Sequence, residues 1–173
     1  MKKPQTNYAF IDGTNLHLTM VNVGWALDYR RFRVYLRDKY HITEAYYFIG
    51  KVPGNEQLYS NLESYGYNIV FKPTLFIPDK GYKGNCDAEL VLEVMKRLND
   101  YDKAVIVTSD GDFRCLVEHL LQVGKLERVL APCRDGCSVL LRKAAGVRID
   151  YLDNLREKLE YKKKEAPHEN ETS

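Results

Sequence analysis

Short apolar runs that end in acidic residues recur along this chain. Residues 104–107 are uniformly apolar and mostly β-branched, a pattern typical of a strand buried on both faces of a parallel sheet. Apolar residues then recur at helical spacing over residues 113–121, and Gly124 ends that helix. Asp110 and Asp112 lie between the two segments. The pattern predicts a strand, an acidic turn and a helix.

The same alternation begins near the N-terminus. Residues 8–11 predict a first strand that ends at Asp12, and Gly13 allows the chain to turn. A helix begins near Asn15, and Thr14 can cap it. The further elements that the pattern predicts are helices over residues 28–40, 55–65, 87–98 and 138–145, and strands over residues 43–49, 67–72, 127–130 and 147–151.

Residues 74–85 predict a polar loop that is longer than most connections in a compact domain. The segment mixes proline and glycine with charged residues, and long loops of this kind are often functional. The helix after the loop begins at Asp87, which occupies a position on its apolar stripe. Because this helix leads into the strand at 104–107, its first turn is expected at the carboxyl edge of the sheet.

Four aspartates should therefore meet at one edge of the sheet. Asp12, Asp110 and Asp112 follow strands at their carboxyl ends, where open α/β sheets bind ligands, and Asp87 points to the same region. Two carboxylates about 5 Å apart repel by roughly 3 kcal/mol at an effective dielectric near 20, so the cluster requires a compensating cation. Ligation by oxygen alone suits Mg²⁺ or Mn²⁺ and disfavours zinc.

A hard cation of this kind prefers phosphate oxygens as further ligands and retains coordinated water. The leading hypothesis is therefore phosphodiester hydrolysis by a metal-activated water. Lys80, Tyr82 and Lys83 in the long loop and Arg114 on the later helix are candidates for substrate contact, because cations bind phosphates and aromatic rings stack on unpaired bases. Charged side chains of this kind more often form a solvated face.

Each polar residue of the cluster also has a simpler explanation. Asp112 precedes a helix and can cap it, Asp12 and Asp110 precede glycine in turns, and Asp87 can interact with a helix dipole. Asn15 fits a metal or substrate-positioning role, or an ordinary first turn of a helix. The simple explanations do not require four aspartates at one edge, and this convergence favours the cation site.

Composition limits the class of protein. With 173 residues, 45% hydrophobic and 29% charged, the chain fits one domain, expected over residues 1–155, and a charged, partly disordered tail over residues 156–173. A net charge of +2 neither indicates nor excludes a nucleic-acid partner. The four cysteines match no usual zinc or disulfide spacing, and no apolar stretch approaches the roughly 20 residues that cross a membrane. A cytoplasmic protein without a membrane partner is expected.

Four spaced motifs together resemble the NYN domain family, in its bacterial LabA-like branch, within the PIN-like nuclease superfamily. They are residues 10–16 (FIDGTNL), 83–90 (KGNCDAEL), 107–113 (VTSDGDF) and 124–125 (GK). The resemblance implies an α/β three-layer sandwich whose mainly parallel central sheet has the strand order 3-2-1-4-5. It also implies Mg²⁺- or Mn²⁺-dependent ribonuclease activity, and the first hypothesis is an endoribonuclease that acts on single-stranded or structured RNA. The matching site residues are Asp12, Asn15, Asp87, Asp110 and Asp112.

The resemblance is incomplete, and other functions compete with it. Glu93 stands where many relatives carry aspartate, and helical phasing predicts that Glu89 and Glu93 are solvated. The alternative function is a non-catalytic RNA-binding or regulatory module that uses the same edge. A phosphatase is disfavoured because the first strand lacks an Asp-x-Asp nucleophile. Tyr46 and Tyr47 are expected at an exposed strand edge, which favours a homodimer.

Overall fold

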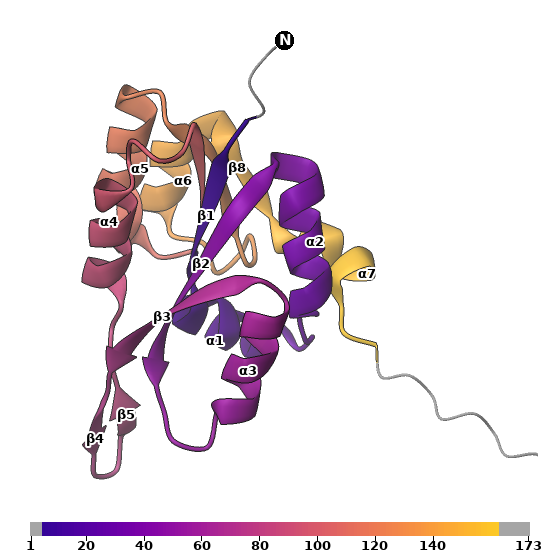
Figure 1. The fold of residues 1–173 in the computed structure, drawn as a ribbon, viewed down its shortest axis with the longest axis vertical. Coiled ribbons are helices and arrows are strands. Elements are labelled where there is room, and N and C mark those ends of the chain that lie inside the picture. Colours follow the sequence, from indigo (N-terminus) through magenta and orange to yellow (C-terminus); the bar gives the residue numbers. More distant parts are fainter. Residues whose placement is uncertain (1–4, 163–173) are drawn as a thin grey trace, which may run out of the picture.

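The structure, a computed structural model, describes residues 5–162. Six parallel strands form its central sheet in the order β3-β2-β1-β6-β7-β8 (Figure 1). The expected strand order 3-2-1-4-5 corresponds to β3-β2-β1-β6-β7. The edge strand predicted at 147–151 is β8, which extends the sheet beyond β7. The strands are β1 (Asn7–Asp12), β2 (Ile42–Lys51), β3 (Tyr67–Pro73), β6 (Lys103–Val107), β7 (Leu126–Ala131) and β8 (Ile149–Tyr151).

Helices cover both faces of the sheet, so the predicted three-layer α/β architecture is confirmed. On one face lie α4 (Asp87–Lys96), α5 (Arg114–Gln122) and α6 (Val139–Ala145). On the other lie α1 (Gly13–Val23), α2 (Tyr29–Tyr40), α3 (Glu56–Ser64) and α7 (Arg156–Leu159). Figure 1 shows the two groups on opposite sides of the strands. Short 3₁₀ turns are η1 (Gly111–Phe113), η2 (Gly146–Arg148) and η3 (Leu152–Leu155).

The alternation of side chains along β1 explains the two cores. Phe10 packs with the α4–α6 layer and Ile11 with the α1–α3 layer, and both are fully buried. Parallel pairing aligns Phe10 with Ile106 and Ile11 with Val107 in β6. The residues that follow these two strands therefore leave the sheet side by side, at its carboxyl edge.

The segment predicted as a polar loop contains an antiparallel hairpin. Its strands are β4 (Leu75–Ile77) and β5 (Gly81–Lys83), which pair Phe76 with Tyr82. The rings of these two residues pack edge to face, 5.3 Å apart. Three-residue strands around a proline turn are too short to show a period of two, so the loop prediction was wrong. The hairpin projects from the body of the domain (Figure 1).

Tyr46 and Tyr47 are buried, so the predicted exposed strand edge is wrong. They lie on β2, which is paired on both sides, and they are 7% and 1% exposed. Tyr46 stacks on Phe10 beneath the Arg97 guanidinium, and the Tyr47 hydroxyl donates a hydrogen bond to the Tyr29 hydroxyl. These contacts remove the argument for a homodimer.

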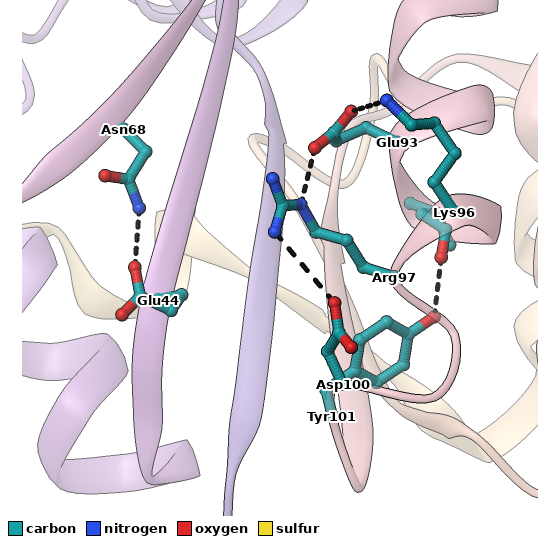
Figure 2. A network of polar contacts seen from close by, with 8 residues as sticks. Glu44, Asn68, Glu93, Lys96, Arg97, Asp100 and Tyr101 are labelled. Carbon is teal, nitrogen blue, oxygen red and sulfur yellow. Dashed lines mark hydrogen bonds and ion pairs between the residues drawn. The ribbon is translucent and has the colours of Figure 1, made fainter.

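Glu93 is not the solvated residue that helical phasing predicted. Its half-buried carboxylate forms ion pairs with Lys96 and Arg97, and Arg97 forms a second ion pair with Asp100 (Figure 2). Glu89 pairs with Lys72 at 3.1 Å. Glu93 therefore neutralises cations near the end of α4 and does not contribute to the aspartate cluster.

The C-terminal segment packs further along the chain than the expected boundary at residue 155. Leu159 is 1% exposed, and its carbonyl accepts a 2.7 Å hydrogen bond from the Asp28 N–H. The Tyr161 N–H donates to the Ala26 carbonyl. The start of the proposed tail, 156–173, thus belongs to the α2 layer, and its remainder, 163–173, lies outside the described residues. None of the helices within 5–162 has the length and apolar character needed to cross a bilayer.

Candidate metal centre

Asp12 closes β1 and caps the helix that follows it. One carboxylate oxygen accepts a 3.1 Å hydrogen bond from the Asn15 N–H, and the other accepts one of 3.1 Å from the Thr108 hydroxyl. The extended backbone of Asp12 suits an N-cap. The prediction that Thr14 caps this helix is therefore wrong. Asp12 holds together the ends of β1 and β6 while it faces the candidate site.

Burial changes the acidity of Asp12. The residue is 7% exposed, and desolvation raises the pKa of its carboxyl group to about 6, although the hydrogen bonds from Asn15 and Thr108 oppose this. The negative charges of Asp87 and Asp110 raise the pKa further. The Asp12 carboxylate therefore interacts electrostatically with two of the other predicted aspartates.

Asp110 and Asp112 have different local roles. The Asp110 carboxylate accepts a 2.9 Å hydrogen bond from the Asp112 N–H and caps η1. The next helix, α5, has no side-chain cap. Within residues 5–162, Asp112 takes part in hydrogen bonds through its backbone N–H and carbonyl, and none to its carboxylate is present. The simpler explanation of Asp112 as a helix cap is therefore wrong, and its carboxylate is available to a ligand.

Gly111 lets these two aspartates sit against the start of α6. A Cβ atom at this position would lie 2.4 Å from the Ser138 hydroxyl oxygen and 3.1 Å from Ser138 Cβ. The Ser138 N–H donates a 3.0 Å hydrogen bond to the Ser109 carbonyl. The acidic turn is thus held closely between β6 and α6.

Asp87 enters the site from α4, whose first residue it is. The Asn85 amide donates a 2.8 Å hydrogen bond to its carboxylate, and the Asn85 side-chain oxygen accepts one of 2.8 Å from the Asp87 N–H. Burial raises the pKa of the Asp87 carboxyl group, and the charges of Asp110 and Asp112 raise it further. Asn85 therefore fixes the direction of Asp87 toward the other acids.

Carboxylate oxygens from Asp87, Asp110 and Asp112 all lie within 4.8 Å of one another. Oxygen ligands about 2.1 Å from Mg²⁺ are separated by about 3–4 Å in an octahedron, so small side-chain adjustments would close the triad around one ion. None of the ion pairs among the described residues involves these three carboxylates. The donor set fits a hard divalent cation. Asp12 lies beside the triad, with both oxygens engaged in hydrogen bonds.

An open cavity of about 410 Å³ adjoins the acids. Asp12, Asn15, Asp87 and Asp110 contribute to its wall, and Lys83 is the basic residue in its lining. The cavity therefore combines carboxylates that could hold a cation with a lysine that could contact an anionic substrate.

The other predicted substrate residues lie apart from this cavity. Tyr82 packs on Phe76 in the hairpin, and Lys80 lies in the hairpin turn. Arg114 forms hydrogen bonds of 2.9 Å to both carboxylate oxygens of Glu118, one turn along α5. Of the four predicted contacts, the structure brings Lys83 alone to the lining of the acid cavity.

Asn15 contacts the end of β6. Its side-chain oxygen accepts hydrogen bonds of 2.9 Å from both the N–H and the hydroxyl of Ser109. The positioning roles of Asn85, Thr108 and Ser109 were not assigned from the sequence. Their positions in the sequence were the signal that could have indicated these roles. Thr108 and Ser109 lie between the strand and Asp110, and Asn85 lies two residues before Asp87.

Comparison with known proteins agrees with the fold and the motifs. The NYN domain family matches residues 8–152. The chain is 28% identical over 176 residues to the low amplitude and bright protein LabA of Synechococcus elongatus, covering 95% of this chain and 93% of the relative. A crystal structure of a Vibrio parahaemolyticus protein of unknown function has a TM-score of 0.76 at 22% identity, covering 92% of this chain and 99% of that one. This structural likeness establishes a shared fold.

Proposed function

This chain belongs to the NYN domain family, and from that premise we propose that it is a Mg²⁺- or Mn²⁺-dependent endoribonuclease that hydrolyses RNA phosphodiester bonds. The family and the fold are nuclease-like, and the observation that carries the proposal is the triad of Asp87, Asp110 and Asp112. Three carboxylates from two separate segments, without a neutralising ion pair among the described residues, favour a cation site, and Asp110 alone of the three caps a helical turn.

Different side chains would bind the cation and position the site. Asp87, Asp110 and Asp112 would hold the cation, and Asp12 would add a fourth carboxylate from the wall of the cavity. When bound, the cation would supply positive charge to a phosphate and lower the pKa of a coordinated water. Asn15 positions the end of β6 through Ser109, which keeps the acidic turn in place.

Substrate contact is proposed for the hairpin side of the cavity. Lys83 lines the cavity beside Asp87 and can contact a phosphate. Tyr82 is 43% exposed and can stack on an unpaired base, and Lys80 can contact the strand beyond it. Arg114 would have to break its hydrogen bonds to Glu118 before it could contact a phosphate. Of the four residues it is therefore expected to contribute least to RNA binding.

Cleavage of RNA in the presence of Mn²⁺ tests this proposal. Wild-type protein should cut RNA with Mn²⁺ and fail to do so with EDTA, and Asp110→Asn should lower the rate by at least about 100-fold because it removes a carboxylate that holds the cation at the reacting phosphate. Asp38→Asn is a matched control, since Asp38 lies in the last turn of α2 and pairs with Arg37. If both variants bind RNA and the wild type never cuts it, the alternative of a non-catalytic RNA-binding or regulatory module replaces the nuclease.

A further inference from the structure

Five adjoining cavities lead from the carboxylate triad across the carboxyl edge of the sheet to the C-terminal segment. The acid cavity and the next one share Thr14, Leu18 and Gly84 in their walls. Each later cavity likewise shares residues with the one before it. Shared walls mean that each cavity lies directly beside the next, so an extended ligand lying over them would contact all five.

The second cavity has the size and lining of a site for one flat ring. It holds about 240 Å³, which is below the roughly 300–1,000 Å³ typical of sites for drug-sized ligands. Leu18, Ile49 and Leu58 supply apolar walls, and His17 and Asn55 supply polar groups. Asn55 makes no side-chain capping hydrogen bond to α3. A nucleobase combines an apolar face with polar edges, so an unpaired base fits this lining.

Two further cavities connect this site to the first turn of α2. The third cavity lies beside Trp25 and the fourth beside Asn61. Tyr29 and Leu58 line the second, third and fourth cavities, and Tyr161 lines both the fourth cavity and the fifth, which is the last. Because α2 leads directly into β2, its first turn lies at the same edge of the sheet as the acids. Aromatic rings therefore recur along the route.

The last cavity is basic. It holds about 840 Å³, and its lining includes Arg30, Arg31, Lys158 and Lys162, with Asp28 as the one carboxylate among the lining residues that the structure describes. Arg31 pairs with Asp28 at 3.5 Å. Among the ion pairs of the described residues, none includes Arg30, Lys158 or Lys162. Glu160 lies near Lys162 and pairs with Arg156.

We propose that a single strand of RNA follows this route, with one phosphate at the triad, an unpaired base in the second cavity and later phosphates held by Arg30, Arg31, Lys158 and Lys162. The proposal rests on the proposed function and adds the class and path of its substrate. The acidic cavity matches a phosphate held through a cation, the apolar second cavity matches a base, and the basic cavity matches the phosphates that follow. A rigid duplex keeps its bases paired and stacked, so it would not place a single base in the second cavity while its phosphates reach the basic end.

Binding of RNA of two lengths tests the route independently of catalysis. The probes are fluorescent single strands of about 4 and about 20 nucleotides, bound to full-length Asp110→Asn protein with Ca²⁺ in place of Mn²⁺, so that a cation can hold the phosphate at the acids while cleavage stays slow. The longer strand should bind at least about tenfold more tightly, since it can reach the acids and the basic cavity at the same time. Adding Arg30→Gln and Lys158→Gln should remove most of this advantage and lower the salt slope by about 1.4, or about 0.7 for each phosphate that the protein no longer neutralises.

The control pair is Arg37→Gln and Lys39→Gln, which remove the same charge from the last turn of α2 at the opposite edge of the sheet. These variants should keep the full length dependence. Equal affinity for both strands, or equal effects of the two pairs, would overturn the route. So would a duplex or an acidic peptide that depends on Arg30 and Lys158 as strongly as the single strand does.

This experiment separates the route from the nuclease. Length-dependent binding that responds to Arg30→Gln and Lys158→Gln, in a protein whose wild type does not cut RNA, would support the route and refute the nuclease. Cleavage without length dependence would support the nuclease and refute the route.

Discussion

The side-chain oxygen of Asn15 accepts two hydrogen bonds of 2.9 Å from Ser109, one from its N–H and one from its hydroxyl. These residues are separated by 94 positions and belong to the first turn of α1 and the end of β6. Asn15 therefore joins the two strand ends that carry Asp12 and Asp110. The sequence left open whether the Asn15 amide contacts a metal or substrate. In the structure its side-chain oxygen holds Ser109 at the end of β6.

Asn15→Ala should destabilise the protein. Ser109 is 5% exposed, so removal of its acceptor leaves a buried N–H without a partner, at a cost of about 1–3 kcal/mol. Urea denaturation in EDTA measures this change in the free energy of unfolding. Asn22→Ala on the exposed side of α1 is the control and should stay within about 0.5 kcal/mol of wild type; equal stability of the two variants would contradict the assigned role.

Gly111→Ala should disturb the positions of Asp110 and Asp112. The new Cβ would lie 2.4 Å from the Ser138 hydroxyl oxygen, so the turn or the start of α6 must move. RNA cleavage should fall by at least about tenfold, since displacement of about 1 Å at a reacting centre can cost about 100-fold.

A second substitution checks that the clash with Ser138 causes this loss. Ser138→Gly removes both contacting atoms, and Ser138 makes no side-chain cap to α6. The double variant should therefore recover most of the rate. A double variant as slow as Gly111→Ala alone would show that the close approach is not the cause.

The stability of the metal-free protein should fall as the pH rises toward neutrality. The folded pKa of Asp12 is raised to about 6 from 3.8, so the folded state binds this proton more tightly than the unfolded chain does. The resulting stabilisation is complete below about pH 4 and is lost as the pH passes through 6, with an upper magnitude of about 3 kcal/mol. Denaturation in EDTA from pH 4 to pH 7 measures it.

Asp12→Asn is the appropriate comparison for the pH experiment, because it keeps a side-chain acceptor for the Asn15 N–H and cannot titrate. Its stability should change less over this range than that of the wild type. Parallel pH profiles for the two proteins would show that Asp12 does not titrate with a raised pKa.

Lys83→Gln and Arg114→Gln should affect RNA binding differently, although each removes one positive charge. Lys83 lines the acid cavity, whereas Arg114 is occupied by Glu118. Lys83→Gln should weaken binding severalfold at low salt and lower the salt slope by about 0.7, and Arg114→Gln should leave both close to wild type. Fluorescence anisotropy at several salt concentrations measures both quantities, and a larger effect at Arg114 would reverse the assignment.

The elements that carry the acids were predictable because their patterns are local. An unbroken apolar run before Asp110 and another before Asp12 indicate buried strands whatever the rest of the chain does. Their adjacency in the sheet came from the family resemblance, since parallel pairing joins residues that are far apart in sequence. The dual role of Asp12 as cap and site residue also depends on that adjacency, through Thr108.

The errors arose where burial depends on tertiary packing. Tyr46 and Tyr47 carry polar hydroxyl groups that suggest a surface, yet neighbouring strands and helices cover them. Leu159 is a single apolar residue in a charged segment, and its docking depends on the surface of α2. A short sequence window contains neither fact.

Anomalous diffraction from crystals soaked in Mn²⁺ tests the proposed cation site most directly. The expected result is a manganese peak bonded to oxygens of Asp87, Asp110 and Asp112, at about 2.1–2.2 Å, which is lost in Asp112→Asn crystals soaked in the same way. Crystals that bind manganese elsewhere, or that leave this triad without a peak at saturating Mn²⁺, would contradict the proposal that these aspartates form a metal centre.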